Sequence, residues 1–586
     1  MLANISTSTV NTKELYFGWL DTTIFVLMLA SSTMIGIYFG IWGKREDTPK
    51  EYLHGGKKMS TVPVAVSLVA SFISGIMVMG APTEIYLYGI NYLLICFSIP
   101  LVGAATYYIY LPVFYDLQLT STYEYLQLRF NRSVRVMASI LCTISLLLYI
   151  PIVVYVPALA FSQVSGMNVH FITPALSVLC IFYTMIGGIK AVVWTDFLQG
   201  VLMLVSGIGV IILGVVKNGG FGTVWERNLE GGRLNVDFNP SPFSRLTFWS
   251  TIFGNAFYWT GVMAINQAMV QKFLSLPSFN KARTSLILFV IFLIMITFVS
   301  CLSGIVIYAT YYDCDPVKSK TVSRPDQVLP YFAMDVARSV PGLPGLFVAG
   351  IFSASLSTMS SCLNALGATL FDDFVRPCLK NKISDKMANN IIKCVIIGVG
   401  AVCVLIVFIV DKLGSVLQLN LSMAGVTNGA LVGLFSLGMF IPRANSKGAL
   451  VGSISSIVLM GWIVFGTQNA MANGDIKQPL LPFRTDGCDV NVTYSDNVEF
   501  QESNEEVFIL YKLSFLYYSL IGIVIVLVIG TIVSYFTEQP EEKQMDPILF
   551  TPIIRKFMER RQDYECTESA EKEFLNYKPE EFSTCH

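Results

Sequence analysis

Six side-chain hydroxyls crowd into nine consecutive positions of one apolar stretch. In SASLSTMSSCLNA, residues 353–365, they belong to Ser353, Ser355, Ser357, Thr358, Ser360 and Ser361. Calcium sites normally include carboxylates, and none lies between Ser353 and Phe371. A single Ser or Thr in a membrane helix commonly bonds back to a preceding carbonyl or packs as a small residue, but six together exceed that ordinary use. The pattern favours a hard monovalent cation held by oxygens without fixed negative charge.

Residues for catalysis are sparse by comparison. The only histidines are at 54, 170 and 586; His54 lies in a basic loop and His170 in a predicted exterior loop. No nucleophile, base and acid are clustered, and no metal-ligand spacing is present. An enzyme is therefore the weakest interpretation of this chain.

The elements that position the hydroxyls must cross a membrane. Of 586 residues, 54% are hydrophobic and 13% are charged, where soluble domains have about 25% charged. With 39 Lys and Arg against 40 Asp and Glu, no basic excess suggests nucleic acid. The first apolar run, Leu20 to Trp42, lacks a basic leader and a cleavage pattern, so we expect a retained helix.

Runs of about 20 apolar residues predict about thirteen transmembrane helices. They lie near 20–43, 62–87, 90–114, 136–162, 168–187, 191–216, 246–270, 284–310, 342–370, 389–411, 416–441, 447–467 and 512–536. No alternation typical of a barrel is present, and a lipid-exposed backbone must bond to itself, so the fold class is an all-α multi-pass membrane protein.

Basic residues gather in every second short loop. They are Lys44, Arg45, Lys50, Lys57, Lys58, Arg129, Arg132, Arg135, Lys190, Lys272, Lys281, Arg283, Arg376, Lys380, Lys382, Lys386, Arg443 and Lys447. The positive-inside rule makes that side cytoplasmic, with the N-terminus outside and the C-terminus inside. This assignment leaves no Lys or Arg at mid-depth to pair a substrate carboxylate.

The opposite loops carry features of an exterior. Asn4 and Asn491 begin glycosylation sequons there, whereas the sequons at Asn131 and Asn420 fall inside or within a span and are discounted. Cys314 and Cys488 are the only cysteines in the predicted exterior loops. We expect a disulfide between them in that oxidising compartment.

Two predicted helices are interrupted. Residues 62–87 contain Gly75, Gly80 and Pro82, and the helix that begins near Phe248 is unusually polar and lies five helices later. Such breaks persist in hydrocarbon where they line a cavity or bind something, although a packing kink is the alternative. A five-plus-five inverted repeat with broken helices at the midplane is typical of secondary transporters.

Several sequence blocks resemble the sodium/solute symporter family. They are FYTMIGGIKAVVWTDFLQG from Phe182, GAPTEIY from Gly80, LTSTYEYLQLRF from Leu119, INQAMVQKF from Ile265 and LSTMSSCLNA from Leu356. The resemblance covers most of the chain, in order, and is closest to the sodium/iodide, sodium/monocarboxylate and sodium-dependent multivitamin branch. It implies a LeuT-type fold: an exterior segment 1–19, an extra helix 20–43, a ten-helix core 62–441, two helices within 447–536 separated by an exterior loop 468–511, and a cytoplasmic tail 537–586.

The resemblance also implies the sites. Sodium, the coupling ion, would be held by the side chains of Ser357 and Thr358 and the carbonyls of Ala70, Ile73 and Ala354. The substrate pocket would comprise Phe72, Met77, Tyr149, Trp259 and Met263. Iodide-carrying relatives have glutamine at the position of Met77 and tyrosine at that of Met263, so this pocket is less polar. Asp196, at the cytoplasmic end of its span, would assist sodium exit or be a solvated capping residue.

These features predict a plasma-membrane symporter that couples sodium to import of a small organic anion. The anion would be a monocarboxylate or a vitamin-like carboxylate such as biotin or pantothenate. Two alternatives stay open: a sodium/iodide-type anion symporter, and a non-transporting channel or solute sensor on the same fold. The expected partners are sodium ions, the small-molecule substrate and the lipid bilayer, with no nucleic acid and no indication of oligomeric state.

Overall fold

A computed structural model describes most of the chain as helices. The described residues are 17–42, 48–322, 324–338, 340–379, 383–410, 416–476, 478–488, 507–537 and 546–558. No β-strand occurs among them. The predicted all-α class is confirmed for this part of the chain, and the glycosylation sequons at Asn4 and Asn491 lie outside it.

The first predicted break is present as a sharp bend. After α1 (Trp19–Ile37) and the short α2 (Pro49–His54), the chain forms α3 (Thr61–Phe72) and α4 (Gly75–Tyr88), which meet at 62°. The break falls at Ile73 and Ser74, both extended, whereas Pro82 lies inside the continuous helix α4. The interruption predicted for this span is therefore real, but Gly80 and Pro82 do not mark it.

The next helices run along the bundle. They are α5 (Ile95–Ala105), α6 (Leu111–Leu117), α7 (Glu124–Arg129), α8 (Arg132–Ser165) and α9 (Val169–Lys217). Two predicted spans, 168–187 and 191–216, lie within the 49 residues of α9. Gly188 has a non-helical backbone, with φ 55° and ψ −156°, a conformation open to glycine, so α9 consists of two helices that meet at a break between the two predicted spans.

The second predicted interruption is a chain of short helical pieces. The short helix α10 (Phe221–Glu230) precedes this segment. The segment itself comprises α11 (Asn255–Thr260) and α12 (Gln267–Leu274), with π-helical turns over Ser250–Gly254 and Gly261–Ile265. Asn266 is extended (φ −60°, ψ 128°) and its side chain caps α12 by accepting a hydrogen bond from the Ala268 amide. The break near the middle of 246–270 thus separates α11 from α12.

The remaining helices complete the bundle. They are α13 (Phe279–Thr310), α14 (Val328–Ala337), α15 (Leu343–Leu370), α16 (Arg376–Cys378), α17 (Asp385–Val410), α18 (Val416–Phe440), α19 (Ser446–Ala472) and α20 (Tyr518–Phe536). Among the described residues, ten helical segments are individually long and apolar enough to cross a membrane, and the bent pair α3 and α4 would be an eleventh. The prediction of thirteen spans differs because it divides α9 and includes the fragmented 246–270 segment.

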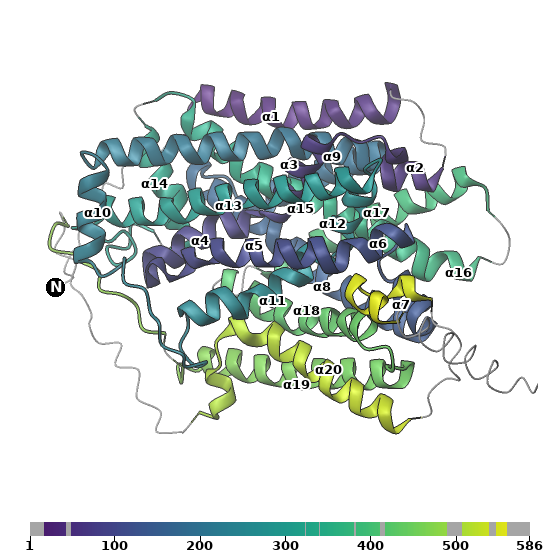
Figure 1. Ribbon diagram of the computed structural model, residues 1–586. Helices are drawn as coiled ribbons and strands as arrows, with labels where there is room; N and C mark the ends of the chain where they lie inside the picture. Colours follow the sequence, from purple (N-terminus) through teal and green to yellow (C-terminus); the bar gives the residue numbers. More distant parts are fainter. Residues whose placement is uncertain are drawn as a thin grey trace, which may run out of the picture.

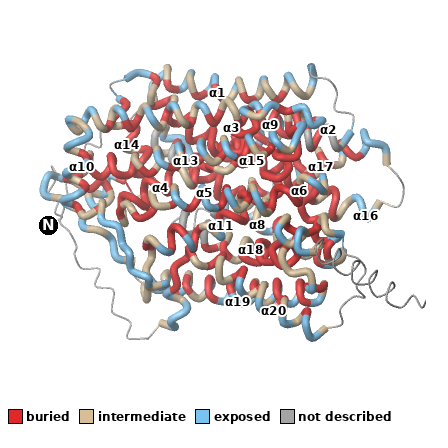
Figure 2. Tube along the Cα trace, in the orientation of Figure 1, coloured by how far each residue is buried: buried red, intermediate tan, exposed pale blue. Residues whose placement is uncertain are grey.

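Helix α15 is the centre of the structure. Figure 1 places α1 along one edge of the bundle and α19 with α20 along the opposite edge, with α3, α9, α13 and α15 between. Buried positions gather on these inner helices in Figure 2. In the apolar stretch that contains α15, 94% of the residues are buried, against 22% in the stretch that contains α1. The hydroxyls of residues 353–361 therefore face protein and not lipid.

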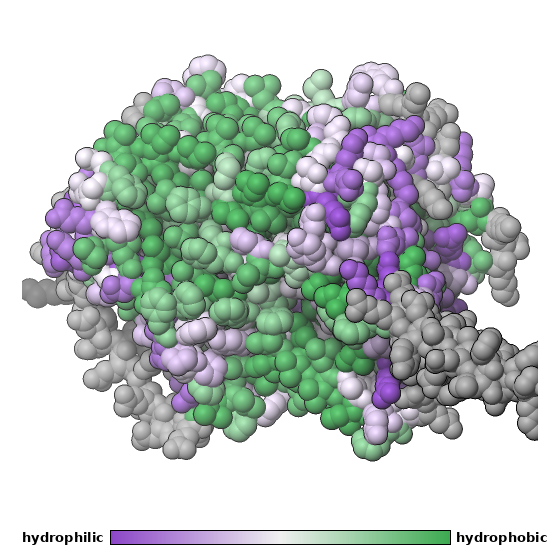
Figure 3. Space-filling view, viewed as in Figure 1, coloured by the Kyte–Doolittle hydropathy of each residue, from purple (hydrophilic) through white to green (hydrophobic). Residues whose placement is uncertain are grey.

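The surface is banded as a membrane protein requires. In Figure 3 a broad hydrophobic region covers the middle of the visible face, and hydrophilic residues gather at the two ends. Figure 1 shows α10 at one end and α7 with α16 at the other. Helices therefore run between two polar ends across an apolar belt, as a multi-span protein does.

A segment of the C-terminal tail docks against the end that carries α7. Leu549 and Phe550 are buried, the Tyr125 hydroxyl donates to the Leu549 carbonyl at 3.1 Å, and the Thr551 amide donates to the Met439 carbonyl at 3.2 Å. Arg129 lies with its guanidinium 5.0 Å from the Phe550 ring and donates to carbonyls at the end of α18. Arg129, expected in a basic loop, is thus a buried structural residue.

Candidate functional site

The hydroxyls of α15 divide into three groups by their partners. Ser357 donates to Asp196 Oδ1 at 2.7 Å, and Ser361 donates to Asp196 Oδ2 at 3.3 Å. Thr358 and Ser360 bond back to the Ala354 and Ser357 carbonyls at 2.9 Å each. The hydroxyls of Ser353 and Ser355 are buried and have no hydrogen-bond partner in the described part of the chain. The ordinary packing use therefore accounts for only some of the six.

The bend between α3 and α4 leaves backbone carbonyls outside both helices. The last bond of the α3 ladder runs from the Ile73 amide to the Val69 carbonyl, 2.8 Å, and the α4 pattern begins at the Ser74 carbonyl, which accepts from Met77 and Val78. The carbonyls of Ala70 and Ile73 fall between these ladders. Free carbonyls at a helix end are oxygen ligands that need no side chain.

The break and the hydroxyl helix lie against each other. Ser71 of α3 and Ser361 of α15 share a hydrogen bond of 2.7 Å. A Cβ placed on Gly75 would lie 2.4 Å from the Ser355 hydroxyl, so only glycine allows this approach. The five residues predicted to hold sodium, Ala70, Ile73, Ala354, Ser357 and Thr358, are all buried on these two facing segments. Their oxygens are the hard donors that an alkali cation takes.

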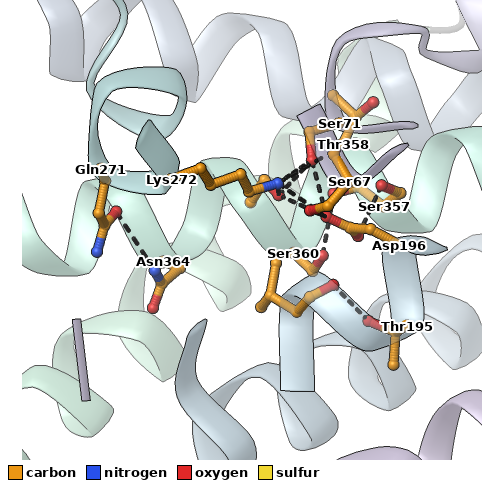
Figure 4. Close-up of polar contacts among 12 residues, drawn as sticks. Ser67, Ser71, Thr195, Asp196, Gln271, Lys272, Ser357, Thr358, Ser360 and Asn364 are labelled. Atoms are coloured by element: carbon orange, nitrogen blue, oxygen red, sulfur yellow. Dashed lines mark hydrogen bonds and ion pairs between the residues drawn. The ribbon is translucent and has the colours of Figure 1, made fainter. Parts of the chain in front are cut away.

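Asp196 of α9 is the centre of a polar cluster that the sequence did not reveal. Its carboxylate is fully buried, and its Oδ2 accepts from Ser67 at 2.7 Å and from Ser71 at 2.8 Å as well as from Ser361, while Oδ1 accepts from Ser357. Figure 4 shows the side chains of α3, α9 and α15 converging on this carboxylate. Asp196 is therefore not a solvated residue at a membrane end, although it does contact Ser357 of the predicted sodium set.

The cluster also contains a cation, Lys272 of α12. Its ammonium lies 2.8 Å from Asp196 Oδ2, 2.9 Å from the Ser361 hydroxyl and 3.3 Å from the Ser67 carbonyl, and it also donates to the Ser71 hydroxyl. The side chain is 2% exposed. The assignment of Lys272 to a loop is wrong because the residue lies in helix α12 and is buried. Lys272 is buried because α12 continues the broken segment into the bundle.

A cavity of about 430 Å³ lies beside this cluster. Four of the five predicted substrate residues line it: Phe72, Met77, Tyr149 and Trp259. The rings of Phe72 and Trp259 are 4.3 Å apart, and the Tyr92 hydroxyl approaches the Met77 sulfur at 3.6 Å. Met263, the fifth, is fully buried in the hydrophobic core and does not line the cavity. Ligand pockets of this size are typically apolar with a few placed polar groups.

The polar residues of the cavity were not among the predicted substrate residues, although Ser361 is one of the six hydroxyls noted in the sequence. They include Ser71, Asn255, Asn266, Ser361, Thr427, Asn428 and Gln468. Trp259 Nε1 and Asn255 Oδ1 are buried and have no hydrogen-bond partner among the described residues. They lie one helical turn apart on α11, and a donor and an acceptor left unsatisfied in a cavity can be satisfied by a ligand. Asn255 was visible beforehand only as one of several polar residues in an apolar run.

Loops at the end that carries α10 are joined covalently. Cys314 and Cys488 form a disulfide with Cα atoms 5.1 Å apart, between chain positions 174 residues apart. Nearby, Glu84 of α4 and Arg245 form a buried bidentate ion pair at 2.8 and 3.0 Å. The disulfide joins the loop after α13 to the loop after α19, and the ion pair holds the segment before α11 against α4.

Comparisons with known proteins agree with one another. The profile of the "Sodium:solute symporter family" matches residues 52–456. The sodium-coupled monocarboxylate transporter 1 of Xenopus laevis is 40% identical over 529 residues, covering 88% of this chain and 85% of the relative. The putative sodium-dependent multivitamin transporter of Drosophila melanogaster is 35% identical over 569 residues, covering 93% of each.

Solved structures share the fold. A Na+-coupled sialic acid symporter, in a substrate-bound outward-open state with a novel Na+-site, superimposes with a TM-score of 0.72 at 24% identity, covering 89% of this chain and 99% of that chain. Mhp1, a nucleobase-cation-symport-1 family transporter, superimposes with a TM-score of 0.50 at 13% identity, covering 85% and 97%. At these identities the likeness concerns the fold.

Proposed function

This chain belongs to the sodium:solute symporter family, and from that premise we propose that it imports a small organic monocarboxylate together with sodium across the plasma membrane. Its relatives are transporters and not enzymes, and sodium coupling is common to the family. The monocarboxylate is our extension, supported by the names of relatives at up to 40% identity and by the cavity.

One observation carries the substrate class. The cavity of about 430 Å³ is lined mainly by apolar and aromatic residues, among them Phe72, Met77 and Trp259, and Trp259 Nε1 is buried without a hydrogen-bond partner among the described residues. A mainly apolar enclosure with a few polar groups fits a short organic chain that ends in a carboxylate. A small inorganic anion has no apolar part to occupy such a lining. Vitamin-like carboxylates such as biotin or pantothenate remain within the proposed class.

For sodium we propose the oxygens of Ala70, Ile73, Ala354, Ser357 and Thr358. In support, Thr358 and Ser357 direct their hydroxyl hydrogens to Ala354 O and to Asp196, which leaves their lone pairs free for a cation. An ion between α3 and α15 is bound well only when the two helices are close. Such differential affinity is what allows the ion to shift a conformational equilibrium.

The driving force is sufficient for accumulation. One sodium falling through 100 mV contributes about 2.3 kcal/mol, and a tenfold concentration gradient adds about 1.4 kcal/mol. For a neutral solute their sum would support a gradient of roughly several hundredfold per sodium, but a monocarboxylate carries one negative charge, which cancels the voltage contribution of one sodium. One sodium therefore supports about a tenfold gradient of the anion, and each further sodium multiplies it by roughly several hundredfold. The proposal also includes an orientation. The N-terminus, the Cys314–Cys488 disulfide and glycans on Asn4 and Asn491 lie outside, and the C-terminal tail lies inside. The thirteen spans take a LeuT-type arrangement.

The test is uptake of radiolabelled solutes by cells that express the chain. The panel contains lactate, pyruvate, a short fatty acid, biotin, pantothenate and iodide, each measured in sodium medium and with choline in place of sodium. We expect concentrative uptake of a monocarboxylate that is lost in choline. Accumulation of iodide alone would replace the substrate class, and sodium currents without accumulation would indicate a channel or sensor.

A further inference from the structure

We propose that Lys272 is a tethered cation that fills a second alkali-cation site around Asp196. This inference deepens the proposed function because it concerns how many sodium ions the chain holds. Under this inference Asp196 pairs with Lys272 in the wild-type chain and does not assist sodium exit. The observation behind it is the oxygen cage around the Lys272 ammonium.

The cage has the composition of a cation site. Around Lys272 Nζ lie one carboxylate oxygen of Asp196, the hydroxyls of Ser71 and Ser361, and the carbonyl of Ser67. These oxygens come from α3, α9 and α15, and all of their residues are buried. Hard monovalent cations take carboxylate, hydroxyl and carbonyl oxygens, and a lysine ammonium takes the same partners.

Only one cation fits in this cage. The ammonium sits at hydrogen-bond distance from Asp196 Oδ2, so a sodium ion on the same oxygen would lie within a few ångströms of a like charge in a buried setting. Repulsion between like charges is strongest where water is excluded. With Lys272 in place, the Asp196 carboxylate is neutralised from within the chain, and sodium is excluded.

Removal of the ammonium would reopen the site. Lys272→Met keeps a long apolar side chain and leaves the buried Asp196 carboxylate without a counter-charge, which is strongly unfavourable. Ser71 and Ser361 belong both to the cage and to the lining of the cavity, so the cage lies directly beside the cavity. Sodium is the available cation of matching charge, and a proton on Asp196 is its competitor.

The predicted sodium set touches the cage through one contact, from Ser357 to Asp196. The Ser357 hydroxyl donates to Asp196 Oδ1 at 2.7 Å, on the side of the carboxylate away from Lys272. The Lys272 and Asp196 pair is neutral overall. Asp196 therefore orients the Ser357 hydroxyl for the sodium set. Because its charge is already balanced by Lys272, it contributes no net negative charge to the bound ion.

The experiment counts sodium ions bound per chain. The full-length protein, purified in detergent, is titrated with radioactive sodium to saturation as wild type, Lys272→Met, Lys272→Arg and the double variant Lys272→Met/Asp196→Asn. We expect Lys272→Met to bind one more sodium than wild type, and Lys272→Arg and the double variant to bind the wild-type number. Equal numbers in Lys272→Met and wild type would mean that Asp196 takes a proton instead, and would overturn the proposal.

The double variant decides the question if Lys272→Met does not yield folded protein. It removes both charges together, so no buried charge is left unpaired. A sodium number lower than that of wild type would show that Asp196 already holds sodium beside Lys272, which contradicts the proposal. Thr358→Ala, added to each background, separates this inference from the proposed sodium set. If Thr358→Ala does not lower the number of sodium ions bound, the proposed sodium set is rejected. The extra sodium expected in Lys272→Met is measured by the difference between variants with and without Lys272, so it does not depend on that result.

Discussion

The Asp196 cluster and the cavity are neighbours that share Ser71 and Ser361, yet they treat polar atoms in opposite ways. In the cluster both oxygens of the carboxylate and the ammonium are engaged by partners from four helices. In the cavity, Trp259 Nε1 and Asn255 Oδ1 are buried with none. Because buried polar groups are normally satisfied, the first region is complete without a ligand and the second is not. Proximity to charge is thus a poorer guide to a binding site than unsatisfied geometry.

The largest effect should come from unbalancing the complete region. Asp196→Asn alone leaves a buried ammonium without its counter-ion, which costs about 3–5 kcal/mol of stability. The double variant with Lys272→Met removes both charges, and we expect most of that loss to be recovered. The measurement is thermal unfolding of purified protein in choline medium. If the two single losses simply add in the double variant, the pair is not a unit and the contrast with the cavity is weakened.

A smaller effect is expected at the predicted sodium set, which contacts the complete region through Ser357 and Asp196. Thr358→Val preserves shape but removes one oxygen ligand, and a hydrogen-bonding interaction with a charged group is worth about 1.5–3 kcal/mol. The sodium concentration for half-maximal uptake should rise roughly 10- to 100-fold. Ser353→Ala, which removes an equally buried hydroxyl without a partner, is the control and should leave this concentration unchanged. Similar shifts in both variants would remove Thr358 from the sodium set.

The incomplete region is tested by removing its free donor. Trp259→Phe retains an aromatic ring but lacks Nε1, so the carboxylate of a substrate would lose one hydrogen bond. We expect KM to rise by about tenfold with little change in maximal uptake. Trp225→Phe, on the exposed helix α10, is the matched control. An unchanged KM in Trp259→Phe would mean that the cavity recognises its substrate without this donor.

The smallest effect concerns selectivity. Met77→Gln places an amide in the apolar lining, as the iodide-carrying relatives have, and should shift the ratio of iodide to monocarboxylate uptake a few-fold towards iodide, about 1 kcal/mol or less. Met77→Leu conserves apolarity and volume and should leave the ratio near that of wild type. The assay is competition between the two labelled solutes. Equal ratios in both variants would place Met77 outside the selectivity determinants.

Much of the fold could be predicted because hydrophobic length and breaks are local properties. The bend after Phe72, the interruption near Gly188 and the polar segment before Asn266 all follow from residue types at those positions. The three-dimensional consequences of these breaks could not be predicted from residue types. The position of a break within a span depends on packing: the first bend falls at Ile73 and Ser74, whereas Pro82 remains in a continuous helix because other groups accommodate it.

The site shows the same limit more sharply. The hydroxyls of α15 were evident from composition, and four of the five substrate residues that the resemblance implies line the cavity. Lys272 was assigned to a loop because Lys281 and Arg283 follow it closely in sequence, whereas its spatial neighbours come from residues 67–71, 196 and 361. Met263 was selected by motif, but its position on the inner side of a π-helical turn buries it away from the cavity. Contacts between distant segments decide such cases.

The disulfide between Cys314 and Cys488 changes the covalent topology of the chain. It makes the 174-residue stretch between them a closed ring, within which the exposed residues Lys318 and Lys320 lie only a few positions from one bridgehead. In the proposed orientation, trypsin added outside intact cells can cut this ring there without releasing a fragment. The nicked transporter would migrate on a gel as one band until a reductant opens the bridge, and then as two, which reports sidedness and oxidation in one lane.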